Sequence, residues 1–358
     1  MAISITRRYA RRWPFSEGVG DNRSVTPTAR QRVNAAVRGE ILDRPPFAVW
    51  RHFYGEEQPG RQLDLAKRLV SFVQQHDLDL LKYNPRAHYH AEPWGTTYRY
   101  DGDAHPTVER AAVTDSSGWR DIQPVPPEGG VFDEMLEGLA FARAALPDVP
   151  IVMTIFTPLA ICERLAGKER LLADLRARPT DVLGALDAVT WTFAGFAQAC
   201  VAAGADGVFL ATTAWAQREV LGDDEYAEFG RPFDLRVLDA VSGAPFNVLH
   251  VCGPQARVLE LASYPVAAVS WNVHAPGNPS PSAFLAGRDD RIGIGGLSDE
   301  AFMSPDDAHL RAETEWLAAQ APRRWVVAGG CTIPTTSRAR SIDRARTLIS
   351  ESAGSWTR

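Results

Sequence analysis

The sequence predicts an α/β protein folded as a (β/α)8 TIM barrel, and three observations support this prediction. Apolar runs rich in β-branched and aromatic residues alternate along the chain with segments of helical periodicity. Polar residues rarely interrupt these runs, as expected for parallel strands that are buried on both faces. The alternation continues for about 300 residues, which is typical of one large barrel with its functional residues at the C-terminal ends of the strands.

Eight strands are expected, with helical segments between and after them. The predicted strands cover residues 47–51, 78–83, 151–156, 207–211, 246–252, 267–273, 292–295 and 325–328. The clearest helical patterns cover residues 63–76, 179–204, 223–243, 304–321 and 336–352. In this order, side chains that follow the fifth and eighth strands would face each other across the barrel mouth.

One connection is too long for a plain strand-to-helix unit. Residues 86–149, which follow the second strand, contain aromatic and β-branched stretches broken by Gly, Asp and Pro. We expect this insertion to form one or two β-hairpins over the barrel mouth, followed by a helix near residues 131–145. A segment in that position can act as a lid.

Composition excludes several classes of protein. The 358 residues are 45% hydrophobic, and a net charge of −6 provides no general attraction to nucleic acid or to anionic membranes. No apolar run reaches the ~18 residues that a membrane span needs. No glycine motif for a nucleotide phosphate is present. The four scattered cysteines predict no disulfide framework and fit a reducing, cytoplasmic location.

The first residues are basic and lack a continuous hydrophobic stretch, unlike a secretion signal. We expect residues 1–25 to form a surface arm that packs on a partner subunit, which would make the protein a homodimer. Residues 26–358 are expected to form a single barrel domain.

His250, Cys252 and Cys331 carry the strongest chemical signal in the chain. His250 and Cys252 are two residues apart at the end of the fifth predicted strand, so their side chains point to the same face. Cys331 follows the eighth predicted strand. One imidazole and two thiolates suit zinc, and three protein ligands leave a fourth position open for a substrate. The sequence therefore predicts a catalytic zinc site at the barrel mouth.

A structural role is the alternative for each of these residues, because free cysteine is among the residue types most often buried in protein cores. Their positions at two strand ends favour the metal site. Cys162 and Cys200 fall within helical patterns, where a structural role is expected.

Polar residues after the first two predicted strands are candidates for substrate binding. They are Arg51, His52, Tyr54, Lys82, Asn84 and Arg86. Arg51 or Arg86 is expected to clamp a carboxylate or phosphonate, because a guanidinium binds such groups in a bidentate manner. The alternative is that these cations pair with acidic residues of the chain itself. His88 and His90 lack a suitably spaced third ligand, which disfavours a second metal site.

The stretch TARQRVNAAVRGEILDRPPFAVW resembles the opening helix and first strand of the uroporphyrinogen decarboxylase superfamily, in which an R-V-x-A-A-x-x-G-E-x-x-D-R-x-P pattern leads into a barrel. The resemblance covers roughly residues 26–350. LHVCG and GGCTIP resemble the H-x-C and distant G-C motifs of its zinc-dependent methyltransferase branch, which includes the methylcobamide:coenzyme M methyltransferases. Cobalamin-independent methionine synthase uses a related arrangement.

This resemblance implies an activity and its cofactors. It implies Zn²⁺ held by His250, Cys252 and Cys331, and transfer of a methyl or other alkyl group to a small-molecule thiol. The donor in that branch is a methylated corrinoid or folate. Because few residues follow Cys331, a methyl-corrinoid would reach this chain as a free molecule or on a separate corrinoid protein.

Departures from the family patterns leave alternatives open. Where methionine synthase supplies a glutamate ligand, this chain has Asn272, with His274 two residues further on; these two are the candidates for a fourth ligand or for supporting the site. The arginine-rich segment and the aspartate of uroporphyrinogen decarboxylases are not intact, so metal-independent decarboxylation of a porphyrinogen or other carboxylated substrate ranks second. A metal- or corrinoid-binding protein without catalytic activity is the third alternative.

Overall fold

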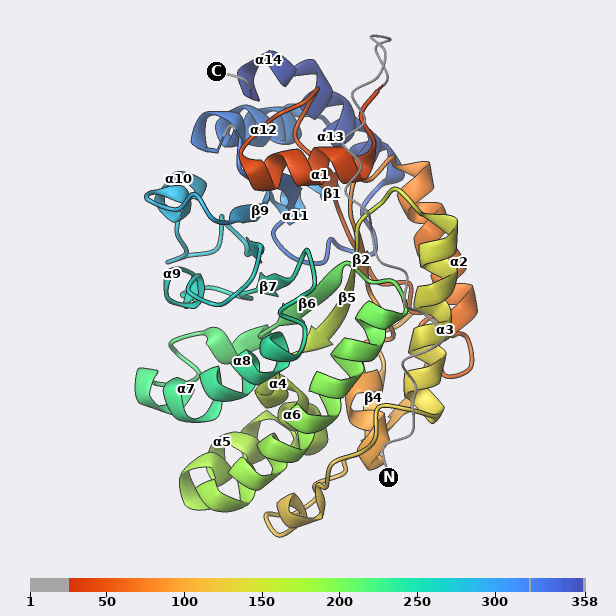
Figure 1. Cartoon of the computed structure of the whole chain (residues 1–358), viewed down its shortest axis with the longest axis vertical. Coiled ribbons are helices and arrows are strands. Elements are labelled where there is room, and N and C mark those ends of the chain that lie inside the picture. Colours follow the sequence, from red (N-terminus) through yellow and green to blue (C-terminus); the bar gives the residue numbers. More distant parts are fainter. Residues whose placement is uncertain (1–25, 322, 357–358) are drawn as a thin grey trace.

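The computed structural model describes residues 26–321 and 323–356, and at its centre an eight-stranded parallel sheet curves into a nearly closed barrel (Figure 1). The strands are β1 (Phe47–Ala48), β2 (Leu81–Tyr83), β5 (Ile151–Phe156), β6 (Gly207–Ala211), β7 (Val248–His250), β8 (Ala268–Ser270), β9 (Ile292–Leu297) and β10 (Trp325–Gly329). They lie in the order β1-β10-β9-β8-β7-β6-β5-β2. Each overlaps a predicted strand, so the predicted TIM barrel is confirmed. The arm predicted for residues 1–25 lies outside the described residues.

Helices flank the sheet (Figure 1). The α-helices are α1 (Ala29–Arg38), α2 (Gln62–Gln75), α3 (Gly130–Ala145), α4 (Pro158–Ala166), α5 (Lys168–Ala177), α6 (Pro179–Ala202), α7 (Asp223–Phe229), α8 (Arg231–Ala240), α9 (Val258–Leu261), α10 (Pro281–Leu285), α11 (Asp299–Met303), α12 (Ala308–Gln320), α13 (Ala339–Glu351) and α14 (Ala353–Trp356). Across the residues that the structure describes, none of these helices has the length and apolar character needed to cross a membrane.

Helix α1 covers the N-terminal end of the barrel. Its Arg30 pairs with Asp206, directly before β6, and Arg324, directly before β10, donates to the Val37 carbonyl at 2.7 Å. Val33 and Ala36 of the same helix belong to the apolar cluster that fills the barrel interior. Because α1 covers this end, the C-terminal end of the strands is the one left for a ligand site.

Strands β1 and β2 lie side by side without a hydrogen-bonded ladder between them in the described part of the chain. Asp79, which is 1% exposed, connects them: it accepts from the Phe47 amide at 2.8 Å, and its own amide donates to the Phe47 carbonyl at 2.8 Å. Arg32 and Arg44 pair with the same buried carboxylate. Arg32 and Arg44 are the arginines of R-V and D-R in the N-terminal pattern. They therefore stabilise the junction between β1 and β2, which is the seam of the barrel.

The insertion after β2 forms one β-hairpin and a helix. Strands β3 (Thr97–Arg99) and β4 (Thr107–Arg110) pair antiparallel, between the 3-10 helices η1 (Tyr89–Trp94) and η2 (Gly118–Asp121). Helix α3 follows, as predicted. Tyr98 and His105, both from the hairpin segment, pack on His88 with ring centroids 4.3 and 5.0 Å away. A third 3-10 helix, η3 (Thr213–Ala216), follows β6.

Asp234 in α8 is expected to make stability pH-dependent. This carboxyl group is fully buried and accepts hydrogen bonds from the Tyr226 and Tyr264 hydroxyls at 2.9 and 3.0 Å. Burial raises the pKa of Asp234 to about 7, so the folded protein holds a proton that the unfolded chain releases near pH 4. The stability that this proton contributes is present at low pH and is lost as pH rises toward 7.

Asp234→Asn removes this titration. We expect the free energy of unfolding of the wild type, relative to this variant, to fall by roughly 3 kcal/mol between pH 5 and pH 8. Urea unfolding at both pH values measures it. Asp187→Asn, at a position that is 63% exposed, is the control and should follow the wild type. If the free energy of unfolding changes with pH in the same way in Asp234→Asn and in the wild type, Asp234 is ionised throughout this pH range.

Candidate metal centre

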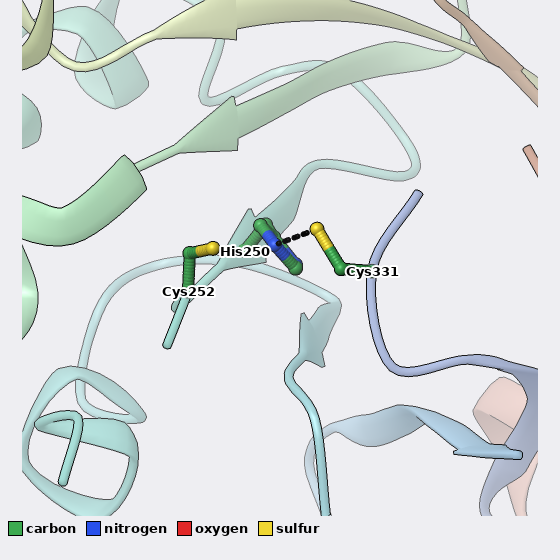
Figure 2. Close-up of side chains that lie close together, drawn as sticks. All are labelled: His250, Cys252 and Cys331. Carbon is green, nitrogen blue, oxygen red and sulfur yellow. Dashed lines mark hydrogen bonds between the residues drawn. The ribbon is translucent and has the colours of Figure 1, made fainter. Parts of the chain in front are cut away.

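The structure brings His250, Cys252 and Cys331 together at the barrel mouth (Figure 2). Their ligand atoms all lie within 4.8 Å of one another, and Cys331 Sγ is 3.5 Å from His250 Nε2. In tetrahedral zinc sites, bond lengths of about 2.0–2.3 Å place ligand atoms roughly 3.3–3.8 Å apart. Small side-chain rotations therefore suffice to enclose a zinc ion.

Two separate strand ends supply these ligands. His250 is the last residue of β7, Cys252 lies two residues beyond it, and Cys331 lies two residues beyond the end of β10. Gly330 lets the chain reach the site, because a Cβ atom there would come within 2.7 Å of the Asn272 side chain. The backbone amide of Gly330 donates to the Leu297 carbonyl at 3.0 Å and fixes the turn.

The two thiols are electrostatically inequivalent. The interaction between the two neighbouring thiols lowers the pKa of Cys331 well below the usual thiol value and raises the pKa of Cys252 well above it. The nearby His250 ring lowers the pKa of Cys331 further. The pair therefore favours the thiolate at Cys331 over that at Cys252, and a cation between the sulfurs would favour both thiolates.

Ser270 orients the imidazole ligand. It pairs with His250 across β7 and β8, and its hydroxyl oxygen lies 3.1 Å from His250 Nδ1, which leaves Nε2 directed at Cys331. Partners of this kind fix the tautomer of a metal-binding histidine. A zinc ion held by the three predicted ligands should bind roughly tenfold or more weakly in Ser270→Ala, measured by competition with a chelator. Ser263→Ala on the surface is the control, and equal affinities for both variants would remove Ser270 from the site.

A cavity of about 260 Å³ opens beside the three ligands. His52, Lys82, Asn84 and Arg86 from the predicted substrate-binding set line it. Lys82 is buried between the Trp50 and Phe209 rings, and its amine donates to Asn84 Oδ1 at 2.6 Å. Burial lowers the pKa of Lys82 to about 8, against the opposing effect of Cys331 and other anionic groups.

His52 is held by a buried carboxylate. Its Nδ1 lies 2.9 and 3.0 Å from the two oxygens of Glu57, which is 1% exposed. Tyr54 stacks on the His52 ring at 4.8 Å but does not itself line the cavity. Burial raises the pKa of Tyr54 to about 12, so its hydroxyl stays protonated.

The two predicted anion clamps are engaged by the protein itself. Arg86 lines the cavity but pairs with Glu92 and Glu134, each at 2.7 Å. Arg51 donates to the Thr335 carbonyl and is not among the cavity residues. Arg86 therefore follows the alternative reading of these cations, in which they pair with acidic residues of the chain itself.

Asn272 and His274 lie beside the site and make other contacts. His274 Nε2 is 3.0 Å from the Gly296 carbonyl oxygen and 3.8 Å from Glu313. Asn272 Oδ1 accepts from the His274 amide at 2.9 Å. Within residues 26–321 and 323–356, the cluster of candidate metal ligands consists of His250, Cys252 and Cys331, and His274 is not part of it.

Comparison with known proteins identifies the family. The sequence model of the uroporphyrinogen decarboxylase (URO-D) family matches residues 28–351. The chain belongs to the URO-D family. No curated protein matches it in sequence.

Solved structures with a similar fold include a methyltransferase from Methanosarcina mazei, with a TM-score of 0.72 and 19% identity over 90% of this chain and 98% of that one. A putative vitamin-B12-independent methionine synthase from Listeria monocytogenes has a TM-score of 0.56 and 12% identity, over 87% of this chain and 97% of that one. At these identities the likeness shows that the URO-D family chain shares their fold.

The structure of this URO-D family member places His88 and His90, which the sequence disfavoured as a second metal pair, at the cavity. It also places there residues that the sequence did not single out: Arg164 from α4, Thr154 and Phe156 from β5, Thr213 from η3, and His105 from the insertion. Arg164 lies inside a helical pattern, where an arginine gives no functional signal.

Proposed function

We propose that the protein is a zinc-dependent methyl- or alkyltransferase that acts on a small-molecule thiol. The observation that carries this proposal is the convergence of His250, Cys252 and Cys331 at the C-terminal end of the barrel. Two thiolates and an imidazole form a donor set that fits zinc and leaves a fourth position for a substrate. Similarity of fold to a methyltransferase supports the same assignment.

The chain's own residues prepare the site for a thiol. Zinc, when bound, supplies the Lewis acidity that lowers the pKa of a thiol and keeps its sulfur nucleophilic. Lys82 and His52 line the same cavity, and Glu57 holds the His52 ring. The Lys82 ammonium is positioned to stabilise the negative charge of a thiolate, while the thiol proton leaves to solvent through the cavity mouth. The Trp50 and Phe209 rings, 5.7 and 4.8 Å from Lys82 Nζ, make this side of the cavity apolar.

The size of the cavity bears on the donor. At about 260 Å³ it lies below the range of roughly 300–1,000 Å³ typical of pockets for drug-sized ligands. A thiol of a few carbon atoms fits this space, whereas a corrinoid or porphyrinogen macrocycle does not. We therefore propose that a methyl-corrinoid or similar donor presents its methyl group at the mouth, free or carried by a partner protein.

The same volume argues against decarboxylation of a porphyrinogen. That reaction also needs cations to hold several carboxylates, and Arg86 is already paired with two glutamates. Decarboxylation of a small carboxylated substrate remains the second candidate, because the chain belongs to the URO-D family.

Metal content and metal-dependent turnover test the proposal. Protein purified without added metal should contain about one zinc per chain, by elemental analysis. Methylation of simple thiols by methylcobalamin should stop after treatment with a chelator and return on addition of zinc. A folded, zinc-free protein that cannot be loaded would contradict the proposal and direct assays to decarboxylation. Tight zinc binding with no turnover on any thiol would favour a non-catalytic metal-binding protein.

A further inference from the structure

The loop between β8 and α10, residues 271–280, packs against the segment that carries Cys331. A Cβ atom added at Gly330, the residue directly before Cys331, would lie 2.7 Å from Cγ of Asn272. The two segments therefore touch without space for a side chain between them. The position of Cys331 depends on the position of this loop.

The same loop holds the turn that follows Cys252, through the side chain of Asn278. Asn278 Nδ2 donates to the Gly253 carbonyl at 3.0 Å and to the Asn272 carbonyl at 2.9 Å. Its Oδ1 accepts from the Ala256 amide at 3.1 Å. Two acceptors and one donor around the side-chain amide fix its orientation. Asn278 therefore ties the turn to the loop at two points.

The turn after Cys252 has a backbone conformation that needs such support. Gln255 has a φ of 46°, which is unfavourable for a residue with a Cβ atom. A conformation of this kind persists only where the surrounding structure holds it. The Gln255 amide donates to the Pro276 carbonyl of the loop at 2.8 Å, and the hydrogen bonds of Asn278 lie on either side of Gln255 in the sequence.

Cys252 depends on this support more than the other two candidate ligands do. His250 belongs to β7 and pairs with both neighbouring strands. Gly330, before the other cysteine, donates to the Leu297 carbonyl at 3.0 Å. Cys252 lies beyond the end of β7, and its own amide makes a longer hydrogen bond, 3.4 Å to Thr212 Oγ1.

We propose that Asn278 is a positioning residue of the candidate metal centre, which holds the turn after Cys252 so that its sulfur stays within reach of the same metal ion as Cys331. The inference rests on the proposed function for the identity of the metal. A turn that is fixed before the metal arrives loses little conformational entropy on binding, so the site binds more tightly. Asn278 itself does not touch the metal or the substrate in this role.

Metal binding tests the proposal. Chelator-treated wild type, Asn278→Ala and Asn278→Asp are titrated with cobalt(II), followed by the thiolate-to-cobalt absorption band, and with zinc in competition with an indicator. Both variants should bind metal roughly tenfold or more weakly, the range for loss of a group that orients a ligand, and should show a weaker band per bound cobalt. Asn278→Asp keeps the side-chain size and the acceptor for Ala256 but loses both donated hydrogen bonds.

Asn247 provides a matched control, because its side-chain amide also bridges two segments. It is 4% exposed, donates to the Val241 carbonyl at 2.9 Å and accepts from the Val208 amide at 3.0 Å. It precedes β7, at the end of the barrel opposite to the metal centre. Asn247→Ala should lower the thermal unfolding temperature but keep the metal affinity and cobalt spectrum of the wild type. Asn34→Ala, at an exposed position in α1, should change neither.

A second arm uses neither zinc nor cobalt. Phenylarsine oxide joins two thiols that lie close together: two As–S bonds form, and the oxide oxygen leaves as water with the two thiol protons. Metal-free wild type should bind it at Cys252 and Cys331, located by mass spectrometry of the digested protein. Asn278→Ala should bind it more weakly, because the two sulfurs are no longer held together. Cys252→Ala, which keeps one thiol of the pair, should not retain it.

The outcomes separate the two proposals. Equal binding of metal, or of the arsenical, by the wild type and Asn278→Ala overturns the positioning role while zinc-dependent chemistry stands. An equal loss of metal in Asn247→Ala reveals general destabilisation and overturns it as well. If the wild type binds neither zinc nor cobalt, the proposed function fails and the arsenical decides. Weaker arsenical binding by Asn278→Ala then supports the positioning role, and no arsenical binding by the wild type overturns it.

Discussion

Replacing Cys252 or Cys331 with alanine is expected to abolish zinc binding and to lower the rate of thiol alkylation by on the order of 10³-fold or more. Each variant keeps only one thiol and one imidazole, too few donors to hold a zinc ion at a site of this type. The rate falls because the metal contributes several kcal/mol of charge stabilisation that no side chain replaces. Elemental analysis and initial rates with a fixed thiol and methylcobalamin measure both effects.

The chain offers a matched control for these variants. Cys200 is a buried thiol in α6, and burial raises its pKa well above the usual value, so it stays protonated and inert. Cys200→Ala should therefore keep both the zinc and the rate of the wild type. If the Cys252 and Cys331 variants keep the full zinc content, or if they lose zinc but keep the full rate, the cluster does not hold a catalytic metal and its role is structural.

Asp79→Ala is expected to lower the free energy of unfolding by about 3–5 kcal/mol, the range for breaking a buried ion pair by removing one partner. The carboxylate is 1% exposed and accepts from Arg32, Arg44 and the Phe47 amide. Its removal leaves two buried guanidinium groups without their shared counter-charge and removes one of the two hydrogen bonds between Phe47 and residue 79, while the backbone bond stays. Urea unfolding of the two proteins at pH 7 measures the change.

A surface aspartate provides the comparison. Asp64 in α2 is 51% exposed and pairs with Arg61 and Lys67, so Asp64→Ala should change stability by no more than about 1 kcal/mol. Asp79→Ala protein that remains folded should still bind zinc, because Asp79 precedes β2 and the metal site lies at the opposite end of the strands. A stability change for Asp79→Ala no larger than that for Asp64→Ala would show that the barrel seam does not depend on it.

The architecture could be predicted from the sequence because its signals are local. Each barrel strand is a short apolar run, and alternation of such runs with helical patterns specifies the fold class and the order of the strands. The juxtaposition of His250 with Cys331, 81 residues away, follows from that order alone, because strand ends meet at the mouth of a parallel barrel.

The choice between cations could not be predicted in the same way. Arg51, Arg86 and Arg164 all carry the same charge, and the sequence does not say which of them the protein neutralises. Arg86 is paired with Glu134, 48 residues away on a helix of the insertion. Arg164 lines the cavity and lies 4.0 Å from Glu163, whose carboxylate accepts from Trp215 Nε1 at 2.7 Å. Long-range contacts determine which cation is paired, and a local sequence pattern contains no information about them.

The seam between β1 and β2 has a consequence for how relatives of this protein are compared. The arginines and aspartates of the N-terminal pattern contact one another and Asp79 at the floor of the barrel, away from the cavity. That pattern therefore reports that a chain can close this barrel and carries no information about its reaction. Relatives that keep it are free to differ in chemistry, and we propose that the residues at positions equivalent to 250, 252 and 331 are the ones by which to sort them.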